Sequence, residues 1–263
     1  MPINVATSPP RNAMYAFDGH LPVGPFDAPA NSLLVAGWAG TSNDNPTING
    51  GGLTWTARRR SANNRVAIWT APCPTPKTGI TITADDTDGL FGGLKVWILT
   101  GADNAAPAGA TGANTSTANA VTVSGYTSTR PGSLGFCVAF ESVIDGGAGV
   151  MPTSTDVAEA YSARDAYAGA GAGLFLRKAA AASAAGEVVT FRLDAAGTAT
   201  ASWEWAAVEI LPPADQTPPT VPGNLRVVEV TGTSLSVAWD ASTDASGIAG
   251  YGVWLDGVKV TGP

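Results

Sequence analysis

The residues of this sequence that could carry out chemistry are few and scattered. His20 is the single histidine among 263 residues, so a metal site built from two histidines is impossible and a catalytic triad would depend on this one residue. Because His20 lies in a proline-rich lead-in without periodicity, we interpret it as an ordinary loop histidine. Gly50, Gly51 and Gly52 precede a predicted strand rather than a helix, so they do not form a phosphate-binding loop.

Carboxylates offer two further candidate sites. Asp85, Asp86 and Asp88 lie in one predicted turn, and clustered carboxylates of this kind can bind calcium. The EF-hand pattern is absent, which favours a solvated turn over a metal site. Glu141 and Asp145 could be a glycosidase pair, but such a pair is defined by the distance between its members. The sequence therefore predicts a protein that is not an enzyme and uses no metal or cofactor.

Tryptophans are the candidate ligand-binding residues, because exposed indole rings can stack on the faces of sugars. Trp203 and Trp205 share one face of a predicted strand, with Glu204 on the other. If that face points outward, the two rings form a glycan-stacking platform, with Trp38 as a third candidate. If it points inward, they belong to the core, which is the alternative that we favour.

Charge excludes one class of partner and favours a soluble surface. The net charge is −7 with 14 basic residues, so no nucleic-acid partner is expected. Arg58, Arg59, Arg60 and Arg65 are the one basic concentration, and we interpret them as the solvated edge of a strand pair. The first residues contain no basic segment followed by an apolar run, and no stretch is long enough to span a membrane, so neither export by a signal peptide nor membrane insertion is expected.

Many short strands must position these residues. Hydrophobic residues make up 44% and charged residues 13%, with 32 Gly and 19 Pro, which is typical of an all-β chain with tight turns. The strands that we expect are apolar or alternating segments: 32–38, 53–60, 65–70, 79–83, 94–99, 134–140, 172–176, 188–193 and 202–211. Cys137 is expected as a buried free thiol and Cys73 at a turn, and a disulfide between them stays open.

The strand order repeats at a spacing of roughly 100 residues, which suggests two similar halves at about 30–104 and 131–211. They could form one large sandwich or two small ones. We favour one jelly-roll-like antiparallel sandwich over residues 1–211, because neither half has a generous core of its own. Residues 105–120 contain no large apolar side chain, so we expect a long surface connection there.

A proline-rich linker at 212–221 precedes a distinct segment at 222–263. Its phrases PGNLRV, TSLSVAWD and DASGIAGYGVWLDG, which begin at Pro222, Thr233 and Asp244, resemble the first three strands of a bacterial or phage fibronectin type III domain. The resemblance implies an immunoglobulin-like sandwich with Trp239 in its core. The later strands of that family are absent from the sequence, so we expect an exposed apolar face and a natural chain that continues beyond Pro263.

The larger region is similar to a β-sandwich found in tail proteins of phages that infect actinobacteria, on the phrases SLLVAGWAG, GGLTWTARR, AIWTAP and GGLKVWILTGAD. Bacterial fibronectin type III domains usually belong to secreted proteins, whereas this chain begins without an export signal. Virion proteins satisfy both observations, because they assemble in the host cytoplasm and work outside the cell.

The resulting hypothesis is a non-enzymatic minor tail protein that acts in tail assembly or host attachment. Its expected partners are other virion proteins, with which it would oligomerise, and a host-surface glycan. The alternative is a secreted or extracellular carbohydrate-binding or adhesion module. A third hypothesis is a polysaccharide depolymerase.

Overall fold

The computed structural model describes residues 2–6, 14–15, 20–41, 45–85, 92–142, 151–155, 157–164, 171–195, 202–215, 218–244, 247–248 and 250–260. Every regular element in these ranges is a β-strand, which confirms the predicted all-β class. The chain forms two compact units, Met1–Pro213 and Ala214–Pro263. The strands of the first unit are β1 (Asn4–Val5), β2 (Met14–Tyr15), β3 (His20–Ala28), β4 (Ser32–Gly40), β5 (Thr47–Gly50), β6 (Thr56–Arg60), β7 (Val66–Cys73), β8 (Lys77–Asp85), β9 (Gly92–Thr100), β10 (Ala108–Ser116), β11 (Ala120–Thr127), β12 (Leu134–Glu141), β13 (Val157–Arg164), β14 (Ala172–Lys178), β15 (Val188–Asp194) and β16 (Trp203–Ile210).

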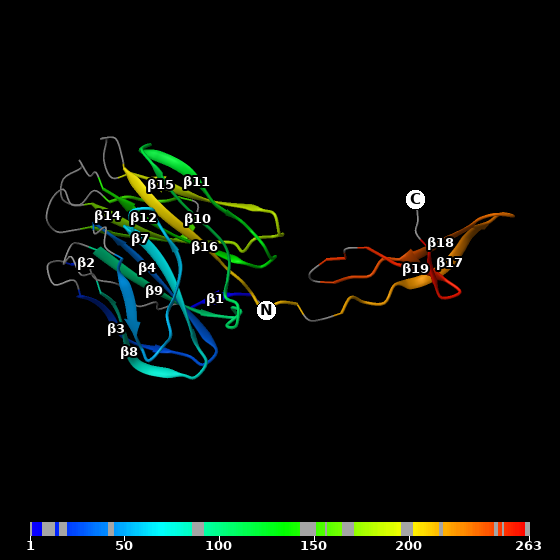
Figure 1. The fold of residues 1–263 in the computed structure, drawn as a ribbon, viewed down its shortest axis with the longest axis horizontal. Coiled ribbons are helices and arrows are strands. Elements are labelled where there is room, and N and C mark those ends of the chain that lie inside the picture. The colour runs from blue at the N-terminus through cyan, green and yellow to red at the C-terminus, as the bar shows by residue number, and fades with distance from the viewer. Residues whose placement is uncertain are drawn as a thin grey trace. The chain divides into compact units, whose positions relative to one another are not determined.

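The first unit consists of four sheets stacked in layers (Figure 1). Inner sheet 1 has the order β1-β9-β4-β7-β6, with β2 also paired to β9, and inner sheet 2 has the order β10-β16-β12-β14-β13. Outer sheet 1, β3-β8-β5, covers the free face of inner sheet 1, and outer sheet 2, β11-β15, covers that of inner sheet 2. The two inner sheets pack directly on each other, so the unit has three hydrophobic cores.

The inner strands read as continuous apolar runs because both of their faces are buried. In β4, Leu33 and Val35 point into the core between the inner sheets, whereas Leu34, Ala36 and Trp38 point toward outer sheet 1. Strands β12 and β16 are likewise buried along their whole length. A strand with two buried faces loses the alternation of apolar and polar residues that would reveal its orientation from sequence.

The two halves have the same strand order, and each follows a jelly-roll-like path between an inner and an outer sheet. Strands β1, β9, β4, β7 and β6 correspond in order to β10, β16, β12, β14 and β13. The edges of the two outer sheets also correspond. In the first half, Thr47 of β5 pairs with Asp85 of β8, and in the second half Thr153 forms an isolated bridge with Asp194 of β15. Each half is a sandwich with its own core, contrary to the expectation that neither half has a generous one, and a third core between the inner sheets joins the two.

The halves are also larger than the ranges 30–104 and 131–211. Strands β1 to β3 pair within the first half, and β10 and β11 pair within the second. The expectation that residues 105–120 form a surface connection was therefore wrong, because Ala108–Ser116 is strand β10. Its small side chains bury little surface, but its backbone pairs with β16 from Ala108↔Ile210 to Ser116↔Trp203. Backbone pairing with β16 holds β10 in the sheet although the segment lacks large apolar side chains.

Polar side chains connect the two halves across their shared core. Lys95, which is buried on β9, lies 2.8 Å from the carboxylate of Glu159 on β13. The indole N–H of Trp97 donates to the same carboxylate over 3.0 Å. Burial alone would raise the pKa of Glu159, but the hydrogen bonds from Lys95 and Trp97 and the charges of Lys95 and Arg177 together outweigh it and hold that pKa below its ordinary value. A second link is the 2.8 Å hydrogen bond from the Asn63 amide to Glu204.

The second unit consists of two hairpins, formed by β17 (Gly223–Val230) with β18 (Leu235–Asp240) and by β19 (Val253–Leu255) with β20 (Val258–Val260). Asp256 and Gly257, both with positive φ, make the tight turn of the second hairpin. Trp239 is half-buried and packs edge-on against Tyr251 at 5.4 Å. Leu225 and Val227, expected to point inward, are 73% and 58% exposed because no second sheet in the described residues covers them.

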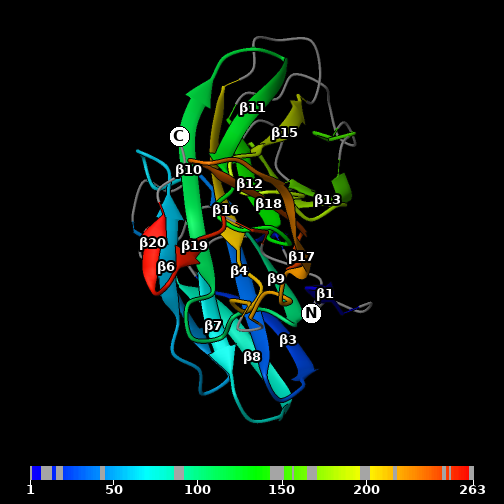
Figure 2. The same cartoon turned by 90° about the vertical axis from the view of Figure 1, so that its right-hand side faces the viewer.

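Both cysteines are buried free thiols. Cys137 lies within β12, as expected, whereas Cys73 is the last residue of β7 rather than a turn residue. They lie in different cores, Cys73 between inner and outer sheet 1 and Cys137 between inner and outer sheet 2. The disulfide that the sequence left open is therefore absent. Figure 2 shows the first unit from the side on which β10 and β11 run next to each other.

Candidate functional site

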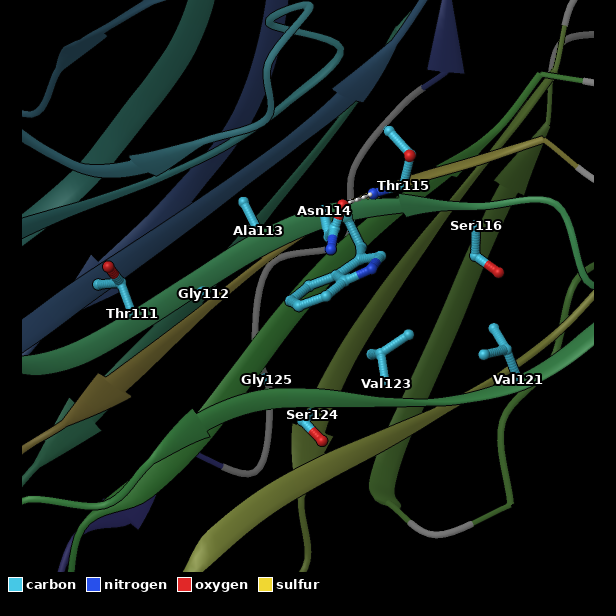
Figure 3. Close-up of a pocket in the computed structure, with 11 residues that line it drawn as sticks. Thr111, Gly112, Ala113, Asn114, Thr115, Ser116, Val121, Val123, Ser124 and Gly125 are labelled. Atoms are coloured by element: carbon cyan, nitrogen blue, oxygen red, sulfur yellow. Dashed lines mark hydrogen bonds between the residues drawn. The ribbon is translucent and has the colours of Figure 1, made fainter.

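A groove of about 490 Å³ lies between β10 and β11, at the open side of the second jelly roll. Strand β10 is the edge of inner sheet 2 and β11 is an edge of outer sheet 2, so the groove separates two sheets. Its walls are residues 111–116 and 121–125 except Thr122, and Trp205 of β16 also lines it. Figure 3 shows the two strands diverging as they run from Gly112 and Gly125 toward Ser116 and Val121.

Strand alternation decides which side chains face the groove. On β10, Gly112, Asn114 and Ser116 pair with residues of β16 whose side chains point toward outer sheet 2. In Figure 3, Ser116 points from β10 toward β11, and Val121 and Val123 point back from β11 toward β10. The groove therefore has apolar groups from Val121, Val123 and Trp205, and a polar rim formed by the Asn114 amide and the Ser116 hydroxyl.

Asn114 is held in place at this rim. Its side-chain oxygen accepts a hydrogen bond of 2.9 Å from the backbone N–H of Thr115. That bond fixes the orientation of the carboxamide, and its NH₂ group remains a donor. An exposed donor with a fixed direction can select the hydroxyl or carbonyl oxygen of a ligand.

The narrow end of the groove depends on two glycines. A Cβ atom added at Gly112 would overlap the carbonyl oxygen of Gly125 and would lie 3.4 Å from the Trp205 ring. A Cβ atom at Gly125 would lie 2.8 Å from Phe191. Glycine in a strand interior often marks a close approach of two backbones, and here the approach closes one end of the groove.

Glu209 fixes the strands beyond that closed end. Its side chain is fully buried and accepts hydrogen bonds of 2.8 Å from the backbone N–H groups of Ala110 and Thr129 and of 2.7 Å from the Thr129 hydroxyl. Ala110 lies in the bulge of β10, and Thr129 follows the end of β11. One carboxylate thus ties together the two segments that flank the groove, and Gly109 leaves the space that this carboxylate occupies.

Glu209 also makes stability depend on pH. Burial alone would raise the pKa of Glu209, but hydrogen bonds from the Ala110 backbone and from Thr129 outweigh it and hold the pKa below its ordinary value. A lowered pKa in the folded state stabilises the protein above the unfolded pKa of about 4.3 and less so as pH falls through the folded value. Urea unfolding should therefore show Glu209→Gln less stable than the native protein at pH 7, with the difference shrinking below about pH 4. A difference that does not change with pH would contradict this.

The strands beside the groove carry no charge or proline at the sheet edge, and the interruptions in their pairing are a bulge in each strand. β10 and β11 contain nine and eight residues, without a charge or a proline. The other end strands of the first unit are short (β1, β5), contain prolines (β3) or carry charged residues (β6, β13, β15). The groove thus lies between two uncharged edge strands, and no charged residue lines it.

The three tryptophans considered as a glycan-stacking platform are core residues, which for Trp203 and Trp205 is the alternative that the sequence favoured. Trp38, Trp203 and Trp205 are 2%, 1% and 5% exposed, because their strand faces point into the cores. Trp38 belongs to the core of the first half, and the other two belong to the core of the second. Only Trp205 among them lines the groove, so it is the one that a ligand there could approach.

The remaining candidates lie apart from the groove. His20 is the first residue of β3, and its Nδ1 lies 2.6 Å from the carboxylate of Asp85, which ends β8. Asp86 and Asp88 lie outside the described residues, as does Asp145, so neither the calcium turn nor the Glu141 pair is defined. Glu141 is buried at the end of β12. Within the described part of the chain, no cluster of three potential metal-ligating side chains occurs.

The basic cluster is largely occupied by contacts within the protein. Arg58 donates to the Thr70 hydroxyl over 2.7 Å, and Arg60 donates to the Pro46 carbonyl and lies over the Trp69 ring. Arg65 lies 3.8 Å from Glu204. Burial lowers the pKa of Arg58 and of Arg60. These contacts match the predicted edge of a strand pair, although only Arg59 is exposed.

The groove residues of β10 were not predicted from the sequence because their segment contains no large apolar side chain. Two signals could have found it. Thr111, Ala113 and Thr115 alternate with smaller or amide side chains. The repeat also requires a strand in the second half that corresponds to β1. No helix in the described ranges has the length and apolarity needed to cross a membrane.

Comparisons with known proteins give two partial similarities. Chitinase Chi52 of Paenibacillus xylanexedens is 41% identical over 78 residues, which are 25% of this chain and 15% of that protein. Chitinase A1 of Niallia circulans is 52% identical over 44 residues, which are 17% of this chain and 6% of that protein. No family model and no solved structure matches the chain. The chain thus spans only a small part of the length of these relatives.

Proposed function

We propose that this protein is a non-enzymatic carbohydrate-binding or adhesion protein and that the groove between β10 and β11 is its binding site. The observation that carries the proposal is the combination of an uncharged polar rim with an apolar floor that includes an indole ring. Sugars present the complementary surface, because their hydroxyl groups form hydrogen bonds while their C–H faces pack on apolar and aromatic groups.

The groove suits binding better than hydrolysis. Glycoside hydrolysis ordinarily requires two carboxyl groups beside the scissile bond, and none of the residues that line the groove is acidic. Glu209, the nearby carboxylate, is buried and bound by backbone N–H groups. The groove would therefore hold a saccharide without cleaving it.

The partial similarity to two chitinases makes chitin the first ligand to test. We expect the full chain to bind insoluble chitin and to release no reducing sugar from it. Asn114→Ala should weaken binding about fivefold to tenfold through the loss of a rim hydrogen bond. Thr122→Ala, on the outward face of β11, is the matched control and should bind normally. A glycan array without hits and no retention on chitin would contradict the proposal.

The phage-tail hypothesis is a narrower proposal about where such a protein works. A jelly-roll unit occurs in both lectin and viral structural domains, so the architecture fits a virion protein that attaches to a host-surface glycan. Mass spectrometry of purified particles from the source phage would test it. Absence of the chain from intact particles would reject the virion location and leave carbohydrate binding untouched.

A further inference from the structure

The two walls of the groove differ in their chemistry. On β11, Val121 and Val123 point toward β10 in Figure 3, and both contact the core beneath outer sheet 2. Because residues two apart on a strand lie about 7 Å from each other on the same face, the two side chains form one apolar surface. On β10, Asn114 and Ser116 present an amide and a hydroxyl. A ligand group between the walls would therefore meet methyl groups on one side and hydrogen-bonding groups on the other.

The wall formed by β10 mainly offers hydrogen-bond donors. The Asn114 oxygen accepts from the backbone N–H of Thr115 at 2.9 Å, and the Ser116 hydroxyl oxygen accepts from the backbone N–H of Ala118 at 3.3 Å. Figure 3 shows the Asn114 oxygen turned toward Thr115 and its nitrogen turned away. The NH₂ group of Asn114 and the O–H of Ser116 can still donate, so this wall favours a ligand group that accepts hydrogen bonds.

An acetamido group matches both walls at once. Its carbonyl oxygen can accept a hydrogen bond from Asn114, while its methyl group packs on Val121 and Val123. A sugar hydroxyl at the same place could use Asn114, but against the valines it would lose water without gaining a partner. The ammonium group of a deacetylated amino sugar would be worse still, because no acidic residue lines the groove to pair with it.

We infer that the groove recognises the acetamido substituent of a neutral amino-sugar glycan. Asn114, Val121 and Val123 are the residues that determine this specificity. The inference rests on the proposed function and names the chemical group on the ligand that the site selects. Any neutral glycan that carries acetamido groups at the spacing of its sugar units is a ligand of this class, whereas a glycan that carries only hydroxyl groups is not.

Two pentasaccharides that differ only in this substituent test the inference. Chitopentaose carries an acetamido group on each sugar, and cellopentaose carries a hydroxyl group in its place. Titration calorimetry with the full chain should give a Kd for chitopentaose at least about tenfold lower than that for cellopentaose. Equal values, or tighter binding of cellopentaose, would overturn the inference and leave the proposed function standing. Binding to neither would count against both.

Variants of the two walls give an independent readout, namely the ratio of the two Kd values. Asn114→Asp keeps the size of the side chain but removes the NH₂ donor, and it should raise the Kd for chitopentaose about tenfold with much less effect on cellopentaose. Val121→Thr keeps the shape and removes a methyl group, and it should raise the Kd for chitopentaose about threefold to fivefold.

Thr122→Asp is the matched control for the added charge. Thr122 is exposed on β11 and does not line the groove, so this variant should leave both Kd values unchanged. If Asn114→Asp weakened both pentasaccharides equally while its urea unfolding stayed native, Asn114 would contact a hydroxyl group common to both sugars and the inference would be wrong.

Discussion

Replacing Trp97 by alanine is expected to lower the free energy of unfolding of the first unit by about 4 kcal/mol, the usual cost of removing a fully buried indole. Trp97 is 0% exposed and lies in the core that joins the two inner sheets, with its ring edge-on to Phe136 at 5.2 Å. The substitution also removes the N–H that donates to Glu159, so the carboxylate that pairs with Lys95 loses one partner.

The matched control is Trp97→Phe, which keeps most of the apolar volume and removes the N–H. It should cost about 1.5–3 kcal/mol, because a lost hydrogen bond to a charged group falls in that range. Chemical unfolding followed by tryptophan fluorescence and circular dichroism measures both. If Trp97→Ala cost less than about 1 kcal/mol, the two halves would not share the core described here.

Replacing Glu209 by alanine is expected to have the second large effect, a loss of about 3 kcal/mol, because buried N–H groups of Ala110 and Thr129 lose their acceptor. The same change should weaken carbohydrate binding, since β10 and the segment after β11 would no longer be tied together. Urea unfolding measures the loss of stability. The affinity for carbohydrate, measured at a temperature at which the variant is folded, reports the effect on the groove.

Glu187→Ala is the control for this second prediction. Glu187 also accepts hydrogen bonds, from the backbone and hydroxyl of Ser183, but it lies on an exposed turn. It should change stability by less than about 0.5 kcal/mol and leave binding unaffected. A folded Glu209→Ala variant with native affinity would show that the groove does not depend on this carboxylate.

Much of the architecture follows from local patterns. The apolar runs around Leu33, Trp97, Phe136 and Trp205 predict buried strands, and their recurrence predicts two similar halves.

The site was harder to predict. Ala108–Ser116 is a strand because its backbone pairs with β16, about 90 residues later in the chain, and the side chains of the segment itself carry only a weak alternation.

The sequence by itself determined that the chain is all-β, that it contains repeated halves and that Trp38, Trp203 and Trp205 are the rings to consider. These properties depend on residue types and on spacing along the chain, which are local. Only the tertiary structure decided that all three rings point inward, that Trp205 alone reaches a groove, and that Gly112 closes one end of it. The physical reason is that a strand buried on both faces carries no polar face to orient it, so stacking of the sheets sets the direction of each side chain.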